Sequence, residues 1–335
     1  MRGVDTIGTF VLATPFYREL RKSFPEAYIA VCVKPLVYDL VKSCPYVNEV
    51  ILYDAKTVFQ KCKFIKKLKN DGYHVAFILS GSFESALSCY LAGIKRRIGY
   101  PHDHRGFLLT HPVKEFEKKH CVEYLLDILR DIGAKIDSVD LELWLPENSF
   151  SISEKNFNEY GITKSDIVIG IGFGVAGEKA REWPNRNWIE LIKLLLNKNI
   201  KIILFGTKND LTESAEIEKN IDNKNLVNLT GKMDLIEFAN CVKRLSLYIS
   251  VATGGIHIAS AVGTNIIGLY PPGDDLYWGP KGKKIRIITK SIDCAPCNQH
   301  KMKRCKNNIC MKSITVDEVY NAINSTLYKG AGLKS

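Results

Sequence analysis

The sequence predicts an α/β protein of two domains, each a parallel sheet covered by helices on both faces. Three observations favour this class. Short apolar runs alternate with helical patterns along the chain, as in parallel-sheet proteins. The alternation is interrupted at residues 141–151, where Pro146, Asn148 and Ser149 give the composition of a loop. The chain has 335 residues, a length that suggests two domains.

The first domain is predicted over residues 1–146. A turn and then a helix occupy residues 6–24, because Gly8 precedes the pattern, Pro15 lies near its start, and Phe16 and Leu20 share one face. The helix expected at 59–70 has a Lys-rich outer face. The remaining pattern predicts strands at 28–33, 49–53 and 75–79, a basic strand or loop at 95–100, and helices at 36–43, 84–92 and 120–132.

The second domain is predicted over residues 150–312, followed by a C-terminal helix and tail at 313–335. Two domains of this kind, facing across a cleft, would bind ligands at the carboxyl ends of their strands. The run Gly170–Gly174 lacks the spacing of a dinucleotide-binding fingerprint, so we set that interpretation aside. The pattern predicts helices at 153–160, 188–197, 211–220, 235–243 and 316–328, and strands at 166–173, 201–205 and 226–228.

Residues 245–273 contain no Asp, Glu, Lys or Arg. Thr253-Gly254-Gly255 interrupts this stretch and Pro271-Pro272 closes it, which argues against a membrane-spanning helix. We expect a strand at 247–251, a glycine-rich turn, a helix at 256–262 and a strand at 265–270. Such a turn leaves backbone N–H groups free at the positive end of a helix, where a phosphate binds readily. Thr253 and His257 add side-chain donors beside it.

The chain carries a formal net charge of +11, which favours anionic partners such as nucleic acid, anionic lipid or phosphorylated sugars. Nucleic acid is the weaker choice, because the sequence has no tract of Lys and Arg alone and no nucleic-acid-binding signature. No long apolar segment follows Met1–Asp5, so we expect no signal peptide and place the protein in the cytoplasm.

Four of the ten cysteines form a cluster, Cys294, Cys297, Cys305 and Cys310, interleaved with basic residues. Four thiols so close in sequence are able to bind zinc tetrahedrally, although their spacing matches no standard zinc finger. The alternative is a loop with free thiols or one disulfide. The other six cysteines are scattered, mostly in apolar runs, and we expect them to be small buried hydrophobic residues.

Five segments, in order along the chain, resemble glycosyltransferase family 9, the heptosyltransferases of lipopolysaccharide core synthesis. They are residues 6–24, 94–100 (IKRRIGY), 182–188 (EWPNRNW), 228–235 (NLTGKMDL) and 253–263 (TGGIHIASAVG). The resemblance implies a GT-B fold, in which the first domain binds the acceptor and the second an ADP-sugar. It also implies metal-independent transfer of heptose with inversion. The acceptor would be a lipid-linked saccharide at the inner face of the membrane, an anionic surface that suits the basic charge.

The resemblance also implies donor-binding residues. Arg181 lies two residues before Trp183, where the family has a Lys-x-Trp-Pro pattern, and would contact the donor phosphates; a solvated surface Arg is the alternative. Thr253, Gly254 and Gly255 would form the phosphate-binding turn, unless they are a simple helix start. His257 has the spacing of the family's His after Thr-Gly, and Met233 matches a residue that lies against adenine in relatives. Core packing is the alternative for both.

Three features depart from the family pattern. Thr9 stands where the family has its catalytic Asp, and a threonine hydroxyl is no base near neutral pH without an activator. Ala252 replaces an Asp before Thr-Gly. Met1–Asp5 is too short and polar to supply the apolar strand that opens relatives, so the first sheet lacks its central strand or the start is truncated; Asp5 is a weakly supported substitute base.

Two alternatives to an active transferase follow from these departures and from the fold. The first is a catalytically inactive relative that binds a nucleotide sugar or glycolipid without transfer. The second is a nucleotide-sugar epimerase on the same scaffold, against which the order of the motifs argues.

Overall fold

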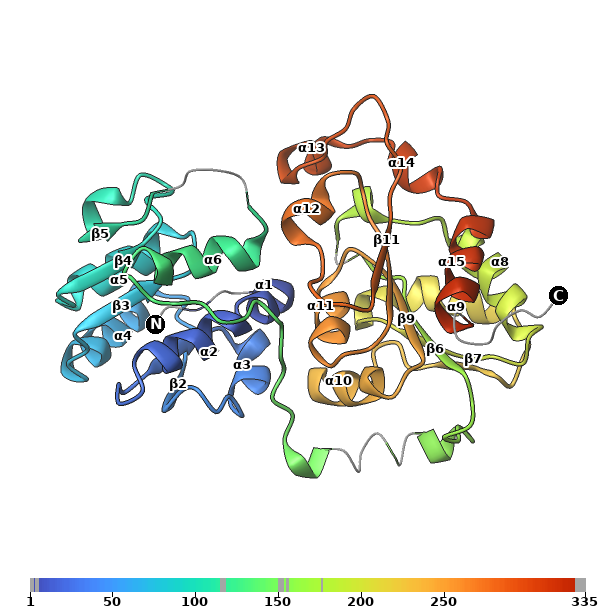
Figure 1. Cartoon of the computed structure of the whole chain (residues 1–335), viewed down its shortest axis with the longest axis horizontal. Coiled ribbons are helices and arrows are strands. Elements are labelled where there is room, and N and C mark those ends of the chain that lie inside the picture. The colour runs from blue at the N-terminus through green and yellow to red at the C-terminus, as the bar shows by residue number, and fades with distance from the viewer. Residues whose placement is uncertain are drawn as a thin grey trace. The chain divides into compact units, whose positions relative to one another are not determined.

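The computed structural model describes residues 3, 6–114, 119–149, 154, 157–175 and 177–328. The chain divides into two compact units, Met1–Trp144 and Leu145–Ser335, and Figure 1 labels their elements. The break between the units lies within the loop-like stretch 141–151.

The strands of the first unit form two parallel groups. Strands β1 (Ala30–Val33) and β2 (Glu49–Leu52) pair with each other, and β3 (Val75–Ile78) pairs with β4 (Arg96–Gly99), which pairs with β5 (His111–Pro112). Among the described residues, no strand lies between β1 and β3. The helices of this unit are α1 (Ile7–Leu12), α2 (Thr14–Ser23), α3 (Pro35–Val41), α4 (Val58–Asn70), α5 (Phe83–Leu91) and α6 (Cys121–Arg130), with a short 3-10 helix, η1 (Gly106–Leu108).

Gly3 lies beside β1. The Gly3 N–H donates to the Cys32 carbonyl at 2.9 Å. The buried Tyr17 hydroxyl has no hydrogen-bond partner among the described residues, and a Cβ on Gly3 would lie 3.4 Å from it. A cavity of about 30 Å³ lies between β1 and β3, with Cys32 and Ala76 in its lining. The described strands of the first unit therefore form two separate groups, with Gly3 hydrogen-bonded beside β1.

The single helix predicted within residues 6–24 is two helices that meet at Ala13. Pro15 lies in the first turn of α2, where its missing N–H costs no hydrogen bond, so a new helix begins there. Thr6 caps α1, and its hydroxyl forms a capping box with Thr9.

The second unit contains one six-stranded parallel sheet in the order β11-β10-β9-β6-β7-β8. Its strands are β6 (Val168–Gly172), β7 (Lys201–Phe205), β8 (Leu226–Asn228), β9 (Leu247–Val251), β10 (Ile266–Leu269) and β11 (Ile285–Ile288). Its helices are α8 (Asn185–Leu196), α9 (Leu211–Lys219), α10 (Leu235–Lys243), α11 (Gly254–Ala261), α12 (Asp274–Trp278), α13 (Gln299–Arg304), α14 (Ile309–Lys312) and α15 (Val316–Leu327).

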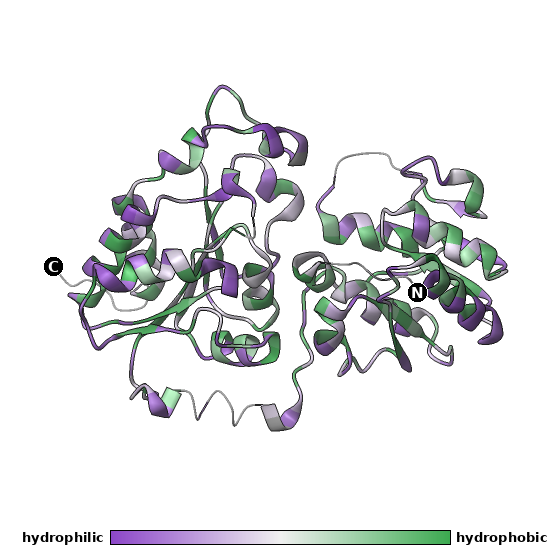
Figure 2. Ribbon diagram, turned by 180° about the vertical axis from the view of Figure 1, so that it is seen from behind, coloured by the Kyte–Doolittle hydropathy of each residue, from purple (hydrophilic) through white to green (hydrophobic). Residues whose placement is uncertain are grey.

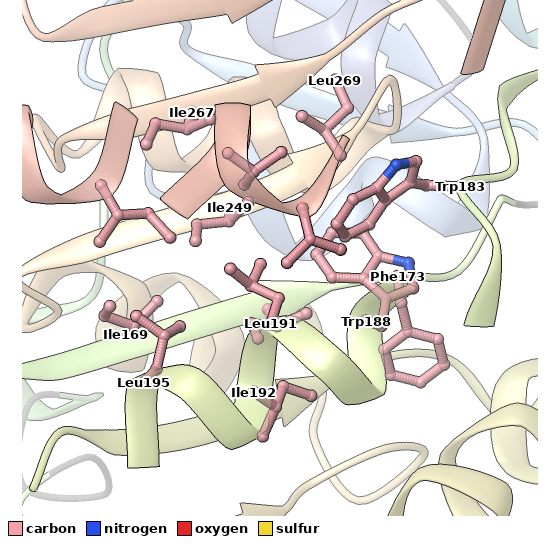
Figure 3. Packing of buried hydrophobic residues seen from close by; sticks show 14 of the residues in the cluster. Ile169, Phe173, Trp183, Trp188, Leu191, Ile192, Leu195, Ile249, Ile267 and Leu269 are labelled. Atoms are coloured by element: carbon pink, nitrogen blue, oxygen red, sulfur yellow. The ribbon is translucent and has the colours of Figure 1, made fainter. Parts of the chain in front are cut away.

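The core of the second unit has one cluster of buried residues on each face of the sheet. On one face, α8 packs Trp188 and Leu191 against β6 and β9, and Trp183 meets Trp188 edge to face at 4.6 Å between ring centroids (Figure 3). The Trp183 indole N–H donates to the Ile314 carbonyl at 2.9 Å. Helix α15 belongs to this same cluster, so the C-terminal helix is part of the second unit. Figure 2 shows the alternation of hydrophilic and hydrophobic residues along the covering helices.

The structure adds elements that the sequence pattern missed. Strand β11 is half-buried at the sheet edge and has an exposed Arg286, so its apolar signal is weak. Strand β5 has two residues, and α12, α13 and α14 have four to six, too few to give a periodic pattern. Helix α11 begins at Gly254, two residues before its predicted start. The predicted helix at 153–160 lies partly, and the tail at 329–335 wholly, outside the described residues.

Candidate active site

The carboxyl ends of the six parallel strands lie at one edge of the second sheet, where α/β proteins bind ligands. The donor-binding residues that the sequence analysis selected lie between these strand ends and the next helix, or in the first turn of that helix. The turn 252–255 follows β9, Gly273 and Asp274 follow β10, and Met233 lies in the loop after β8. Thr9 belongs to the first unit and is not part of this group.

The turn after β9 presents open backbone donors. Gly254 and Gly255 are the first two residues of α11, both half-buried, and within the described residues neither N–H has a hydrogen-bond acceptor. Thr253 makes no capping hydrogen bond, and its hydroxyl lies 3.3 Å from that of Ser250. A Cβ on Gly255 would lie 2.9 Å from the Tyr248 hydroxyl, so only glycine fits here without displacement. This turn has the donors and the helix end that a phosphate needs.

Arg181 is held by Asp274. The Arg181 Nε lies 3.1 Å and Nη2 3.0 Å from Asp274 Oδ2, and Nη2 also lies 3.3 Å from Oδ1. The Asp274 side chain is 1% exposed and that of Arg181 is 18% exposed. Burial raises the pKa of the Asp274 carboxyl, and the nearby Arg181 partly offsets that rise. The pair fixes the guanidinium and leaves Nη1 without a hydrogen-bond acceptor among the described residues.

His257 and Met233 lie closer to the core than the resemblance implies. His257 is 5% exposed, on the buried face of α11. Met233 is half-buried and packs against the cluster that includes Phe205 and Tyr248. Helix α10, which begins two residues after Met233, packs beside α11, and its Phe238 lies 3.1 Å from a Cβ built on Gly255 of the turn.

Thr9 and Ala252, which stand where the family has carboxylates, both make contacts within their own units. The Thr9 hydroxyl donates to the Thr6 carbonyl at 3.1 Å and lies 2.7 Å from the Thr6 hydroxyl, so it completes the cap of α1. None of the described residues places a basic group against it. Ala252 is 5% exposed and packs in the core cluster. Asp5 lies outside the described residues.

The four clustered cysteines act on one another electrostatically, since in addition to burial Cys297, Cys305 and Cys294 all raise the pKa of Cys310. Among the described residues, no group of three or more His, Cys, Asp or Glu side chains is placed to hold a metal ion. The thiols are free, with Cys310 buried in the core and Cys294 exposed. Burial raises the pKa of the Cys297 and Cys310 thiols, and the neighbouring thiols of the cluster raise it further. The zinc site stays a prediction.

Asp274 is the residue of this edge that sequence reasoning missed. A signal was present, because Asp274 is the first carboxylate after the uncharged stretch 245–273 and follows a buried strand by only a few residues. Gly273 has φ = 92°, a left-handed conformation that turns the chain so that Asp274 enters the interior.

Comparison with known proteins decides the family. The model for glycosyltransferase family 9 (heptosyltransferase) matches residues 61–307. The chain belongs to this family. The glycosyltransferase prediction is thereby confirmed at the level of enzyme class. This family 9 chain is 27% identical over 301 residues to lipopolysaccharide heptosyltransferase 2 of Escherichia coli, with 85% of this chain and 86% of the relative covered. It is 24% identical over 307 residues to lipooligosaccharide heptosyltransferase 2 of Haemophilus ducreyi, with 85% and 86% covered.

Solved structures confirm the GT-B prediction for this family 9 chain. The ADP-heptose lipopolysaccharide heptosyltransferase II of Escherichia coli matches with a TM-score of 0.81 at 22% identity, covering 99% of this chain and 98% of that one. A family 9 glycosyltransferase from Veillonella parvula matches with a TM-score of 0.89 at 19% identity, covering 98% and 96%. None of the described helices has the length and apolar content to cross a bilayer.

Proposed function

We propose that this chain transfers heptose, or a related sugar, from an ADP-activated donor to a lipopolysaccharide-core or similar glycolipid acceptor. Transfer would invert the anomeric carbon and use no metal. The observation that carries the proposal is the turn Thr253–Gly255, whose open N–H groups stand at the start of α11 in a family of heptosyltransferases. The second unit would bind the donor and the first the acceptor.

The donor chemistry needs groups that stabilise the departing diphosphate. In our proposal the N–H groups of Gly254 and Gly255, with the Thr253 hydroxyl, bind the phosphates. Arg181 is oriented by Asp274 and directs its remaining N–H donors toward the same diphosphate. Met233 lies against adenine, and His257 supports the turn from its buried position in α11.

The acceptor and location follow from the same proposal. Relatives are named for lipopolysaccharide and lipooligosaccharide, so we infer an acceptor of that chemistry. The net charge of +11 suits an anionic membrane surface, and we place the protein in the cytoplasm, at the inner face of the membrane. We assign no nucleic-acid partner.

An inactive relative is the second candidate, and one observation favours it. The Thr9 hydroxyl is engaged in the cap of α1, and Ala252 has no carboxylate to offer. A chain with the donor turn but no base would bind the ADP-sugar and fail to transfer it.

Replacing Thr9 distinguishes the two candidates. We expect slow transfer by the natural chain and a gain of at least about 100-fold for Thr9→Asp, the usual contribution of a positioned base. Thr9→Asn is the matched control, because it has a similar shape and no basic oxygen. The Asp variant should fold, since α1 has no acidic residue in its first turn and an acid there is favourable. Transfer by the Asp variant alone, or by none of the three chains, with ADP binding retained, would support the inactive relative.

The structural zinc remains a prediction from sequence alone, for Cys294, Cys297, Cys305 and Cys310. Elemental analysis of the purified protein tests it, with one equivalent of zinc as the supporting result. The proposed transfer does not depend on the outcome.

A further inference from the structure

The first unit carries exposed apolar side chains where helix α4 begins. Val58 and Phe59 are 78% and 79% exposed. These two side chains are not required to stabilise the start of α4, because Thr57 and Gln60 form the capping box there. A single exposed apolar residue needs no explanation, but these two are adjacent and have apolar neighbours.

The start of α5 lies beside the start of α4. Lys61 Nζ lies 3.0 Å from Glu84 Oε2, and the Tyr53 hydroxyl also donates to Glu84. Phe83, next to Glu84, is 39% exposed and packs against Phe107, which is 74% exposed, with 6.2 Å between the ring centroids. Because α4, α5 and η1 each follow a strand of the first unit, their starts share the carboxyl edge of its parallel strands.

Behind this apolar edge, α4 presents a row of lysines. Lys63 and Lys66 lie four and seven residues after Phe59, so the three share one face of the helix, with Lys69 at its margin. All three lysines are exposed, none has an ion-pair partner among the described residues, and α4 contains no acidic residue. The opposite face packs Phe64 against the core of the unit.

We propose that this surface docks the protein on an anionic lipid bilayer. The α4 surface consists of Val58, Phe59, Phe83, Phe107, Lys63, Lys66 and Lys69. Its apolar side chains would enter the boundary between headgroups and acyl chains, and its lysines would face anionic headgroups. A second copy of the chain fits less well, because a symmetric interface would bring two lysine rows together. The inference rests on the proposed function in assuming a membrane-borne acceptor.

Binding to vesicles tests the proposal. The full chain is mixed with phosphatidylethanolamine–phosphatidylglycerol vesicles or with phosphatidylcholine vesicles, and the bound fraction is measured by flotation. We expect binding to the anionic vesicles that weakens as salt is raised. Phe59→Ser should weaken it about tenfold. The triple variant Lys63→Gln, Lys66→Gln and Lys69→Gln should weaken it at least about tenfold.

A matched triple variant separates the surface from net charge alone. This control removes the same charge from three exposed lysines of the second unit, through Lys198→Gln, Lys219→Gln and Lys224→Gln. Its vesicle binding should stay within about twofold of that of the natural chain. Equal loss in both triple variants, or no binding by the natural chain, would overturn the proposal. So would a concentration-dependent dimer, seen by sedimentation without lipid, that Phe59→Ser abolishes.

A nucleotide titration on the same variants separates this inference from the proposed function. None of the changed residues lies in the second unit's candidate site, so ADP binding should be unchanged in the α4 variants. Retained ADP binding with no vesicle binding would reject the α4 surface and leave the proposed function standing. Vesicle binding without ADP binding would reject the donor site instead.

Discussion

At the residue scale, the polar groups that sequence assigns to chemistry already have partners in the protein. The Thr9 hydroxyl satisfies the start of α1 through Thr6, and the Arg181 guanidinium is paired with a buried Asp274. The cap of α1 therefore explains the threonine at position 9 without any catalytic role. Arg181 has a fixed orientation that an unpaired surface arginine would lack.

The Arg181–Asp274 pair should matter for stability in an asymmetric way. Arg181→Gln leaves a carboxylate that is 1% exposed without its cation, and we expect it to lower the free energy of unfolding by about 3 kcal/mol. Asp274→Asn leaves a partly exposed cation, so it should lower the free energy of unfolding by less, about 1–2 kcal/mol. Urea unfolding of the natural chain and both variants measures this. A smaller cost for Arg181→Gln than for Asp274→Asn would contradict it.

The same pair gives the Arg181→Gln defect a pH dependence. Because burial raises the pKa of Asp274, the folded chain releases this proton at a higher pH than the unfolded chain does. The stability from this group is full below its ordinary pKa of about 3.9 and is lost as pH rises through the folded-state pKa. Removing Arg181 raises that pKa further. The difference in free energy of unfolding between the natural chain and the variant should therefore shrink as pH falls toward that ordinary pKa. A difference that widens would refute the assignment.

At the element scale, the sequence pattern located nearly every long helix and buried strand. Strands β6, β7, β9 and β10 are short apolar runs buried on both faces, so composition alone marks them. The pattern missed elements that are too short or too exposed to show a regular spacing of apolar residues. Examples are β11 at the sheet edge and the one-turn helices α12 and α14. It also joined α1 and α2, because both bury apolar residues and only Pro15 signals the break.

The described strands of the first unit form two groups, β1-β2 and β3-β4-β5, and this arrangement leads to a prediction about the first sheet. A further cavity of about 960 Å³ lies at the amino ends of these strands, with Tyr28 and Val75 in its lining. Placing Lys-Ile-Leu-Val-Ile ahead of Met1 should supply a parallel strand and raise the melting temperature by at least about 3 °C, as buried apolar area outweighs ordering entropy. Lys-Gly-Ser-Gly-Ser, of equal length, should not. Equal melting temperatures for the two extensions would contradict this prediction.

At the scale of the whole molecule, the sequence predicted where the candidate turn lies better than which residues surround it. The uncharged stretch 245–273 identified the turn after β9, because a glycine-rich break between buried strands is visible in composition. The Asp274 partner of Arg181 was not predictable, since the two residues are 93 positions apart and meet only when β10 and the loop before α8 are folded. The buried position of His257 depends likewise on how α11 packs.

The central claim is that the second unit binds an ADP-sugar at the carboxyl edge of its sheet. The most direct test is to measure how nucleotides change the melting temperature of the full chain. Purified protein is heated with ADP, ADP-heptose, UDP-glucose or GDP-mannose. We predict a rise in melting temperature with the two adenine compounds alone, since a ligand of the native state at 100 times its Kd adds about 2.7 kcal/mol. No rise with ADP or ADP-heptose, or an equal rise with all four, would contradict the account.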